Sequence, residues 1–274
     1  SYLGDGAIWL KSTDYGDDKD RVLVKSDGEF TYLTPDVAYH RDKFSRADWL
    51  INVWGADHHG YIARMKAAME ALGHEAEQLT VTITQLVKLV RSGEEVRLSK
   101  RHGDIIELRE IVEEIGPDAT RFMYLLQSVD TKQTFDLDLA ASKVMDNPVF
   151  YVQMAHARIR SIQNKAETLG IWPSRSSDAD LSLLEHEREL EILRNLFNFS
   201  DIVQLSAREL APHKIAVWLR ELATSVHGFY HDCYVVGETV TPELTAARLQ
   251  LVEAARIGLV SGLDLLGVSA PDSM

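Results

Sequence analysis

The chain has 274 residues, enough for one large domain or two of ordinary size, and its 45% apolar and 26% charged content is typical of a globular protein. The net charge of −13 is spread over both halves, which excludes a nucleic-acid binder that works through a general cationic excess. No apolar run is long enough to span a membrane, so we expect no membrane partner. The single cysteine, Cys233, excludes an intrachain disulfide and favours a reducing, cytoplasmic location.

The beginning of the chain predicts short strands. Residues 7–11 and 21–25 are β-type runs on either side of an acidic turn that contains glycine, which indicates a hairpin. Residues 30–34 predict a further strand. It ends at Thr34-Pro35-Asp36, where a threonine N-cap, a proline in the first turn and an acidic residue indicate the start of a helix.

The next stretch predicts a parallel pair of strands. Residues 49–54 form an apolar run that we expect to be a strand buried on both faces. Residues 62–72 have the spacing of an amphipathic helix, and residues 79–90 are rich in β-branched side chains. This order of strand, helix and strand predicts a crossover within a parallel sheet.

The second half is predicted to be helical. Short helices are expected over residues 105–115 and from Asp118, and Asn147-Pro148 indicates the start of a long one. Apolar residues then recur three and four apart, as in Ile215, Leu219, Leu222, Val226 and Phe229. The fold class is therefore α/β followed by an all-α helical bundle.

Tyr32 and Asp36 are the first candidates for a binding site. Tyr32 is expected at the carboxyl end of a strand and Asp36 in the first turn of the next helix, and ligands bind at that edge of an open parallel sheet. A phenol and a carboxylate there could recognise a guanidinium or ammonium group. The alternative is a core aromatic residue and an acid that interacts only with the helix dipole.

The turn at residues 55–60 (Gly-Ala-Asp-His-His-Gly) is the second candidate. Its glycines let the backbone approach a ligand closely, and Asp57 could accept hydrogen bonds from ribose hydroxyls. A metal-dependent hydrolase centred on Asp57, His58 and His59 is a competing hypothesis, although adjacent histidines point in different directions. The sequence contains no P-loop motif.

Two basic segments complete the candidates. Residues 97–101 (Arg-Leu-Ser-Lys-Arg) contain three cations and a hydroxyl after an apolar run, which suits a triphosphate, although a solvated basic turn is an alternative. Cations also recur at Arg158, Arg160 and Lys165 on a predicted helix. These cationic side chains could bind RNA phosphates, or they could form a solvated helix face without a ligand.

Several segments together resemble the arginyl-tRNA synthetases, a family of class I aminoacyl-tRNA synthetases. The resemblance extends over the whole chain in the right order. It is carried by residues 30–39, 53–61, 96–103, 117–122, 147–158 and 262–271.

The resemblance implies a fold and an activity. Residues 1–140 would be the C-terminal part of a Rossmann-like catalytic domain, and residues 141–274 a helical anticodon-binding domain. The implied activity is that of an arginine–tRNA ligase in protein synthesis, with arginine, ATP and tRNA(Arg) as partners. ATP would enter with Mg²⁺ as a substrate, without a tightly bound cofactor or a protein metal site, and the full-length enzyme would be a cytoplasmic monomer.

The resemblance also implies roles for single residues. Residues 97–101 resemble the Lys-Met-Ser-Lys-Ser loop that stabilises the ATP phosphates, with Arg97 in place of the first lysine and Ser99 and Lys100 at matching positions. Tyr32 and Asp36 would hold the substrate guanidinium. The implied ATP-binding residues are Gly55, Asp57 and His58. The implied RNA contacts are Tyr151, Gln153, His156 and Arg158.

One departure from the family pattern limits these expectations. Class I synthetases have a His-x-Gly-His element that contacts the ATP phosphates, and these 274 residues contain none. The first residue is also not methionine, so we expect a truncated chain that is inactive in isolation. The alternative function is a non-catalytic tRNA-binding module in which only the helical half acts.

Overall fold

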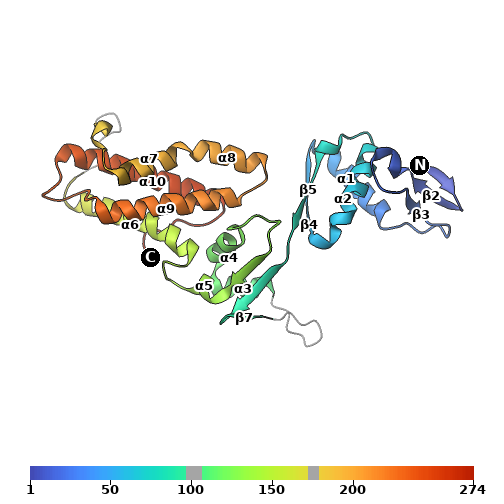
Figure 1. The fold of residues 1–274 in the computed structure, drawn as a ribbon, viewed down its shortest axis with the longest axis horizontal. Helices are drawn as coiled ribbons and strands as arrows, with labels where there is room; N and C mark the ends of the chain where they lie inside the picture. Colours follow the sequence, from blue (N-terminus) through green and yellow to red (C-terminus); the bar gives the residue numbers. More distant parts are fainter. Residues whose placement is uncertain (97–106, 172–178) are drawn as a thin grey trace. The chain divides into compact units, whose positions relative to one another are not determined.

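The structure is a computed structural model that describes residues 1–96, 107–171 and 179–274. It consists of two compact units, which we describe separately (Figure 1). Unit 1 contains residues 1–86 and 129–132, and unit 2 contains residues 87–128 and 133–274.

Unit 1 begins with a small antiparallel sheet. Strands β1 (Tyr2–Gly4), β2 (Ala7–Leu10) and β3 (Arg21–Val24) lie side by side in that order, which confirms the predicted hairpin. The 3-10 helix η1 (Ser12–Tyr15) occupies the connection between β2 and β3. Arg21 Nε donates to Asp17 Oδ2 at 2.7 Å, and this largely buried ion pair lies at the start of β3.

The segment before helix α1 (Leu33–Phe44) differs from its prediction. Residues 30–34 do not form a strand, because only Phe30 makes a bridge, to Val24. Tyr32 has helical backbone angles and precedes the first residue of α1, so it is not at the end of a strand. Thr34 is not the N-cap either, since its hydroxyl donates to the Leu23 carbonyl at 2.6 Å and joins the helix to β3.

The predicted parallel pair is present. Strand β4 (Leu50–Gly55) pairs in parallel with β5 (Leu79–Thr84), and helix α2 (Ile62–Glu70) connects them after the 3-10 helix η2 (Ala56–Tyr61) and before the 3-10 helix η3 (Ala76–Gln78). The expectation that β4 is buried on both faces was wrong. Leu50 and Asn52 are buried, whereas Ile51 and Val53 are 45% and 65% exposed, because the described residues cover only one face of this strand.

Unit 2 begins with a second small sheet and three short helices. Strand β6 (Val87–Arg91) pairs antiparallel with β7 (Glu94–Glu95) and parallel with β8 (Gln133–Asp136). Helices α3 (Leu108–Ile115), α4 (Pro117–Tyr124) and α5 (Leu137–Ala141) pack with this sheet around a core of buried side chains. That core consists of Leu89, Ile111, Met123, Phe135, Leu137 and Ala140.

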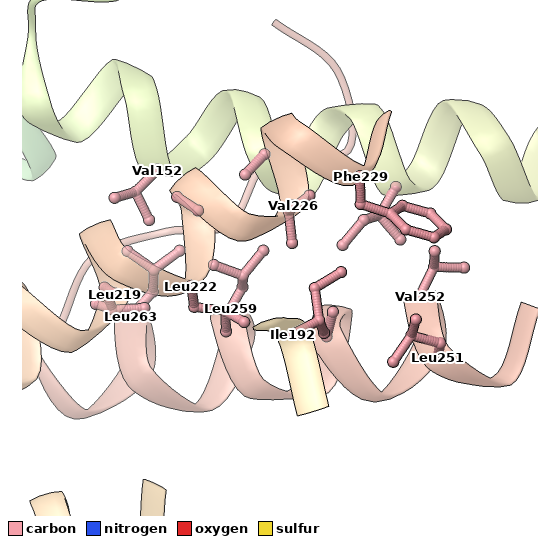
Figure 2. Close-up of a cluster of buried hydrophobic side chains, with 14 of the residues drawn as sticks. Val152, Ile192, Leu219, Leu222, Val226, Phe229, Leu251, Val252, Leu259 and Leu263 are labelled. Atoms are coloured by element: carbon pink, nitrogen blue, oxygen red, sulfur yellow. The ribbon is translucent and has the colours of Figure 1, made fainter. Parts of the chain in front are cut away.

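The rest of unit 2 is the predicted helical bundle. Its elements are α6 (Pro148–Thr168), the 3-10 helix η4 (Leu181–Leu183), α7 (Glu187–Phe197), α8 (Phe199–Arg208), α9 (His213–Asp232) and α10 (Pro242–Leu265). Figure 2 shows how side chains from α6, α7, α9 and α10 meet in one apolar core. All five residues of the predicted apolar stripe on α9 are buried, which confirms that periodicity.

Two glycines of α10 allow it to lie close to its neighbours. A Cβ at Gly262 would lie 2.7 Å from Leu219 Cδ2 and 3.0 Å from Trp218 Cζ3, both inside the core. A Cβ at Gly258 would lie 2.7 Å from Leu196 Cδ2. The bundle therefore depends on the absence of a side chain at these positions.

Within the described part of the chain, no helix is long and apolar enough to cross a membrane.

The boundary between units 1 and 2, at residues 86 and 87, separates two groups of residues that each pack mainly among themselves. The domain boundary predicted between residues 140 and 141 falls at the end of α5, just before the connection to α6, and it stays a prediction.

Candidate functional site

The first candidate site is an open cavity beside the first turn of α1. Its volume is about 540 Å³, and we call it the Asp36 pocket. Both residues that the sequence predicted for guanidinium recognition line it. Its lining residues are Tyr32, Asp36, Tyr39, His40, Lys43, Asn52, Trp54, His58 and Tyr61.

Tyr61 holds one oxygen of the Asp36 carboxylate. Its hydroxyl donates to Asp36 Oδ2 at 3.0 Å. Burial and the neighbouring Asp36 raise the pKa of Tyr61 to about 12, so the phenol keeps its proton at neutral pH and remains a donor. Asp36 Oδ1 has no hydrogen-bond partner among the described residues. The carboxylate therefore presents a free acceptor and a negative charge to the pocket.

Two buried residues, His40 and Asn52, connect to the same turn of α1. His40 Nδ1 lies 2.7 Å from the Asp36 carbonyl oxygen, and His40 Nε2 lies 2.7 Å from Asn52 Nδ2. Because a carbonyl can only accept, Nδ1 carries the proton and Nε2 accepts from the Asn52 amide. Lys43 Nζ in turn donates to Asn52 Oδ1 at 3.3 Å. This network joins α1 to β4.

Three aromatic side chains, Tyr32, Trp54 and Tyr61, contribute to the lining of the pocket. Tyr32 is 92% exposed at the start of α1. The Trp54 and Tyr61 rings pack edge to face with centroids 5.9 Å apart, and the Arg64 guanidinium lies 4.7 Å from the Tyr61 ring centroid. A planar cation can stack on such rings while it pairs with a carboxylate.

The glycine-bracketed turn follows β4 as the sequence predicted. Gly55 ends the strand with an extended backbone, and Asp57 and His58 lie in η2. His58 lines the Asp36 pocket, so one residue predicted to bind ATP lies beside the two predicted to bind arginine. The Asp57 side chain is 82% exposed, and its Oδ2 lies 3.7 Å from His58 Nε2.

The competing metal-site hypothesis finds no support in this geometry. Across residues 1–96, 107–171 and 179–274, the structure contains no group of three or more side chains arranged to hold a metal ion. The residues predicted to contact the ATP phosphates, Arg97, Ser99 and Lys100, lie outside the described residues.

The bundle places the four predicted RNA-binding residues in two different environments. Gln153 is buried and its amide donates to Asp118 Oδ2 and to the Ser269 carbonyl. His156 is 1% exposed, and its Nδ1 bonds the Pro271 carbonyl at 2.9 Å. These two side chains hold the C-terminal segment to α6, and in this conformation they expose little surface to RNA.

Tyr151 and Arg158 are more accessible and lie on the side of α6 that meets α9. Arg158 Nη1 lies 2.8 Å from His227 Nδ1, and its guanidinium lies 5.1 Å from the centroid of the Tyr230 ring. Tyr151 packs edge to face on His227 and donates to Thr224 Oγ1 at 3.1 Å. We call Tyr151, Arg158, His227 and Tyr230 the α6–α9 cluster.

Comparison with known protein families decides the identity of the catalytic part. Residues 2–163, more than half of the chain, match the family described as "tRNA synthetases class I (R), catalytic domain". The chain belongs to this family. Residues 152–274 match the DALR anticodon binding domain, which confirms the predicted order of a class I catalytic domain and a helical domain.

Two curated relatives match the whole length of this class I synthetase chain. It is 48% identical over 275 residues to arginine–tRNA ligase 1 of Halalkalibacterium halodurans, and 50% identical over 274 residues to the arginine–tRNA ligase of Listeria welshimeri. The chain spans only 49% of each, about half the length of the curated relatives that it matches.

Solved structures agree with the fold. A crystal structure described as an arginyl-tRNA synthetase from Campylobacter jejuni superposes with a TM-score of 0.89 at 36% identity, over all of this chain and 59% of that one. The arginyl-tRNA synthetase of Thermus thermophilus superposes with a TM-score of 0.79 at 24% identity, over 99% of this chain and 55% of that one. The second likeness shows the fold alone.

Sequence reasoning missed several residues of this class I synthetase that shape the two sites. Tyr61 is 25 residues from Asp36, and His227 is 69 residues from Arg158, so local spacing gave no indication of either contact. A weaker signal existed for His40, which follows Asp36 by four residues and so shares its helix face.

Proposed function

We propose that this chain is the part of an arginine–tRNA ligase that recognises the arginine side chain and the tRNA. The complete enzyme would activate arginine with ATP and transfer it to tRNA(Arg) in protein synthesis. The observation that carries the proposal is the Asp36 pocket. There a half-buried carboxylate has one oxygen held by Tyr61 and the other free for a ligand.

The chemistry of the pocket fits a guanidinium. A guanidinium is planar, permanently charged and rich in donors, so it pairs with a carboxylate and stacks on aromatic rings. Tyr32 and Asp36 would hold this group, as the sequence predicted. Because Tyr61 occupies Asp36 Oδ2, the first contact of the guanidinium would be with Oδ1.

The remaining steps belong to the nucleotide side of the site. We propose that Gly55, Asp57 and His58 line the ATP site and that Lys100, with Arg97 and Ser99, neutralises charge on the departing pyrophosphate. The arginine carboxylate would attack the α-phosphate in line. ATP would arrive as its Mg²⁺ complex, a substrate, and no tightly bound cofactor is proposed.

The RNA side of the proposal rests on the helical domain. Tyr151 and Arg158 combine an aromatic ring with a cation that pairs with no described carboxylate, which suits RNA bases and phosphates. We place the domain boundary between residues 140 and 141. We also propose that the full-length enzyme is a cytoplasmic monomer and that these 274 residues alone do not activate arginine, since they contain no His-x-Gly-His element.

The experiment is a calorimetric titration of L-arginine into the chain and into two variants. Asp36→Asn keeps the shape of the side chain but removes its charge, so we expect arginine affinity to fall by at least tenfold, the size of a lost hydrogen bond to a charged group. Asp42→Asn is the matched control on the same helix, where Asp42 is exposed and pairs with Arg46. Equal affinity of the wild type and Asp36→Asn would refute the proposal. RNA binding without any arginine binding would favour the non-catalytic tRNA-binding module.

A further inference from the structure

We infer that His227 is a positioning residue that holds the Arg158 guanidinium in place for RNA. The inference rests on the proposed function, because it names a residue that acts through one of the proposed RNA contacts. It concerns only unit 2. The residues of the α6–α9 cluster come from α6 and α9, two long helices of the bundle in that unit.

The two ring nitrogens of His227 have different roles, which follow from their hydrogen-bond partners. Nε2 lies 3.0 Å from the Tyr151 carbonyl oxygen, which can only accept, so Nε2 carries the proton. Nδ1 is then the acceptor for Arg158 Nη1 at 2.8 Å. Burial and the charge of Arg158 lower the pKa of His227, which keeps the ring in this neutral form at physiological pH.

This contact matters because Arg158 has no other polar partner among the described residues. Its guanidinium also lies over the face of the Tyr230 ring, and Tyr230 is 44% exposed. The nearby Arg160 differs, since its Nε pairs with Asp272 at 3.1 Å and its Nη1 donates to Gln163 at 2.8 Å. The positive charge of Arg160 is therefore compensated within the protein, whereas that of Arg158 is held in position by a neutral group.

A neutral acceptor has a specific advantage at this position. A carboxylate would fix the guanidinium equally well, but it would also cancel the charge that attracts a phosphate. The imidazole fixes one guanidinium nitrogen and leaves the charge and the other donors free. A side chain already held in one rotamer also loses less conformational entropy when RNA binds.

The test uses the unmodified transcript of tRNA(Arg) and measures its affinity for the chain by fluorescence anisotropy. His227→Phe keeps the aromatic packing on Tyr151 but removes both hydrogen bonds. His227→Asn loses the ring and its bond to Tyr151, but it places a carbonyl oxygen near the position of Nδ1, where it can accept from Arg158. Positioning of Arg158 therefore predicts that the Phe variant binds about tenfold more weakly than the wild type and that the Asn variant recovers part of that loss.

A purely packing role predicts the reverse order, because Phe preserves the ring and Asn does not. The result that would overturn the inference is thus an RNA affinity of His227→Phe equal to the wild type or higher than that of His227→Asn. Thermal unfolding of each variant identifies any that fails to fold. If wild-type chain does not bind the transcript at all, the RNA part of the proposed function fails instead.

A double-mutant cycle provides an independent check. Arg158→Met removes the group that His227 is inferred to position, so adding His227→Phe to it should change RNA affinity less than twofold. If the double variant instead loses RNA affinity by the product of the two single losses, His227 acts on RNA binding without Arg158. That result would overturn the inference.

Discussion

Asp36 and Arg158 each have a charged side chain that is held by a neutral neighbour. Asp36 is held by the hydroxyl of Tyr61, and Arg158 by the imidazole of His227. Neither partner carries a charge at neutral pH, because the pKa of Tyr61 is raised to about 12 and that of His227 is lowered. Each ionic group is therefore oriented without being neutralised.

The first residue-scale prediction concerns Tyr61. In Tyr61→Phe, Asp36 loses the one side-chain donor that it has among the described residues, so the carboxylate can rotate and must be ordered again when arginine binds. We expect arginine affinity to fall about fivefold, the size of one ordinary hydrogen bond. Calorimetry on this variant and on Tyr15→Phe measures the effect, since Tyr15 lies in η1 and does not line the Asp36 pocket. A Tyr61→Phe affinity equal to that of Tyr15→Phe would mean that Tyr61 does not order the carboxylate.

The sequence indicated the reactive residues at this scale but not the residues that hold them. Tyr32 and Asp36 were predicted from a strand end and a helix start, and His58 from the family resemblance. All three line one pocket, although the strand expected before Tyr32 is absent. Their supporting contacts join distant segments, such as His40 on α1 to Asn52 on β4. Contacts of this kind depend on how elements pack, which local spacing does not specify.

At the scale of elements, helix periodicity was a better guide than strand propensity. The bundle helices follow their apolar spacing because each buries a broad stripe in the common core. Residues 30–34 have strand-forming side chains, yet Leu33 is buried as the first residue of α1 and Thr34 bonds back to β3. Tertiary contacts decided the conformation of this short segment.

Asn147 gives the prediction that belongs to this scale. It is 2% exposed, its side chain accepts from Val149 N at 3.2 Å, and its amide donates to the carbonyls of Ala140 and Ser142. Asn147→Ala removes the N-cap of α6 and leaves one buried and one partly buried carbonyl with one donor fewer. We expect the free energy of unfolding to fall by about 2–3 kcal/mol, as measured by urea denaturation.

The control for this prediction is Asp180→Ala. Asp180 caps the exposed 3-10 helix η4, where its carboxylate accepts from Ser182 N at 3.0 Å in contact with solvent. Water can replace that bond, so the loss should be below about 1 kcal/mol. Equal losses for the two variants would show that the buried contacts of Asn147 do not stabilise α6.

At the scale of the whole molecule, the two proposed ligand sites lie in different units. The Asp36 pocket belongs to unit 1 and the α6–α9 cluster to unit 2. The order of an α/β part and a helical part was predictable from the change in periodicity along the chain. The packing boundary at residues 86 and 87 was not, because it falls inside a continuous β-branched run that divides between β5 and β6.

The proposed function requires that this chain recognises arginine through the charge of its guanidinium. The most direct measurement compares calorimetric titrations of L-arginine and L-citrulline into the chain. Citrulline has nearly the same shape, but a neutral urea group replaces the guanidinium, so it cannot form the charged pair with Asp36. We predict that arginine binds at least tenfold more tightly than citrulline. Equal affinities for the two amino acids would contradict the claim.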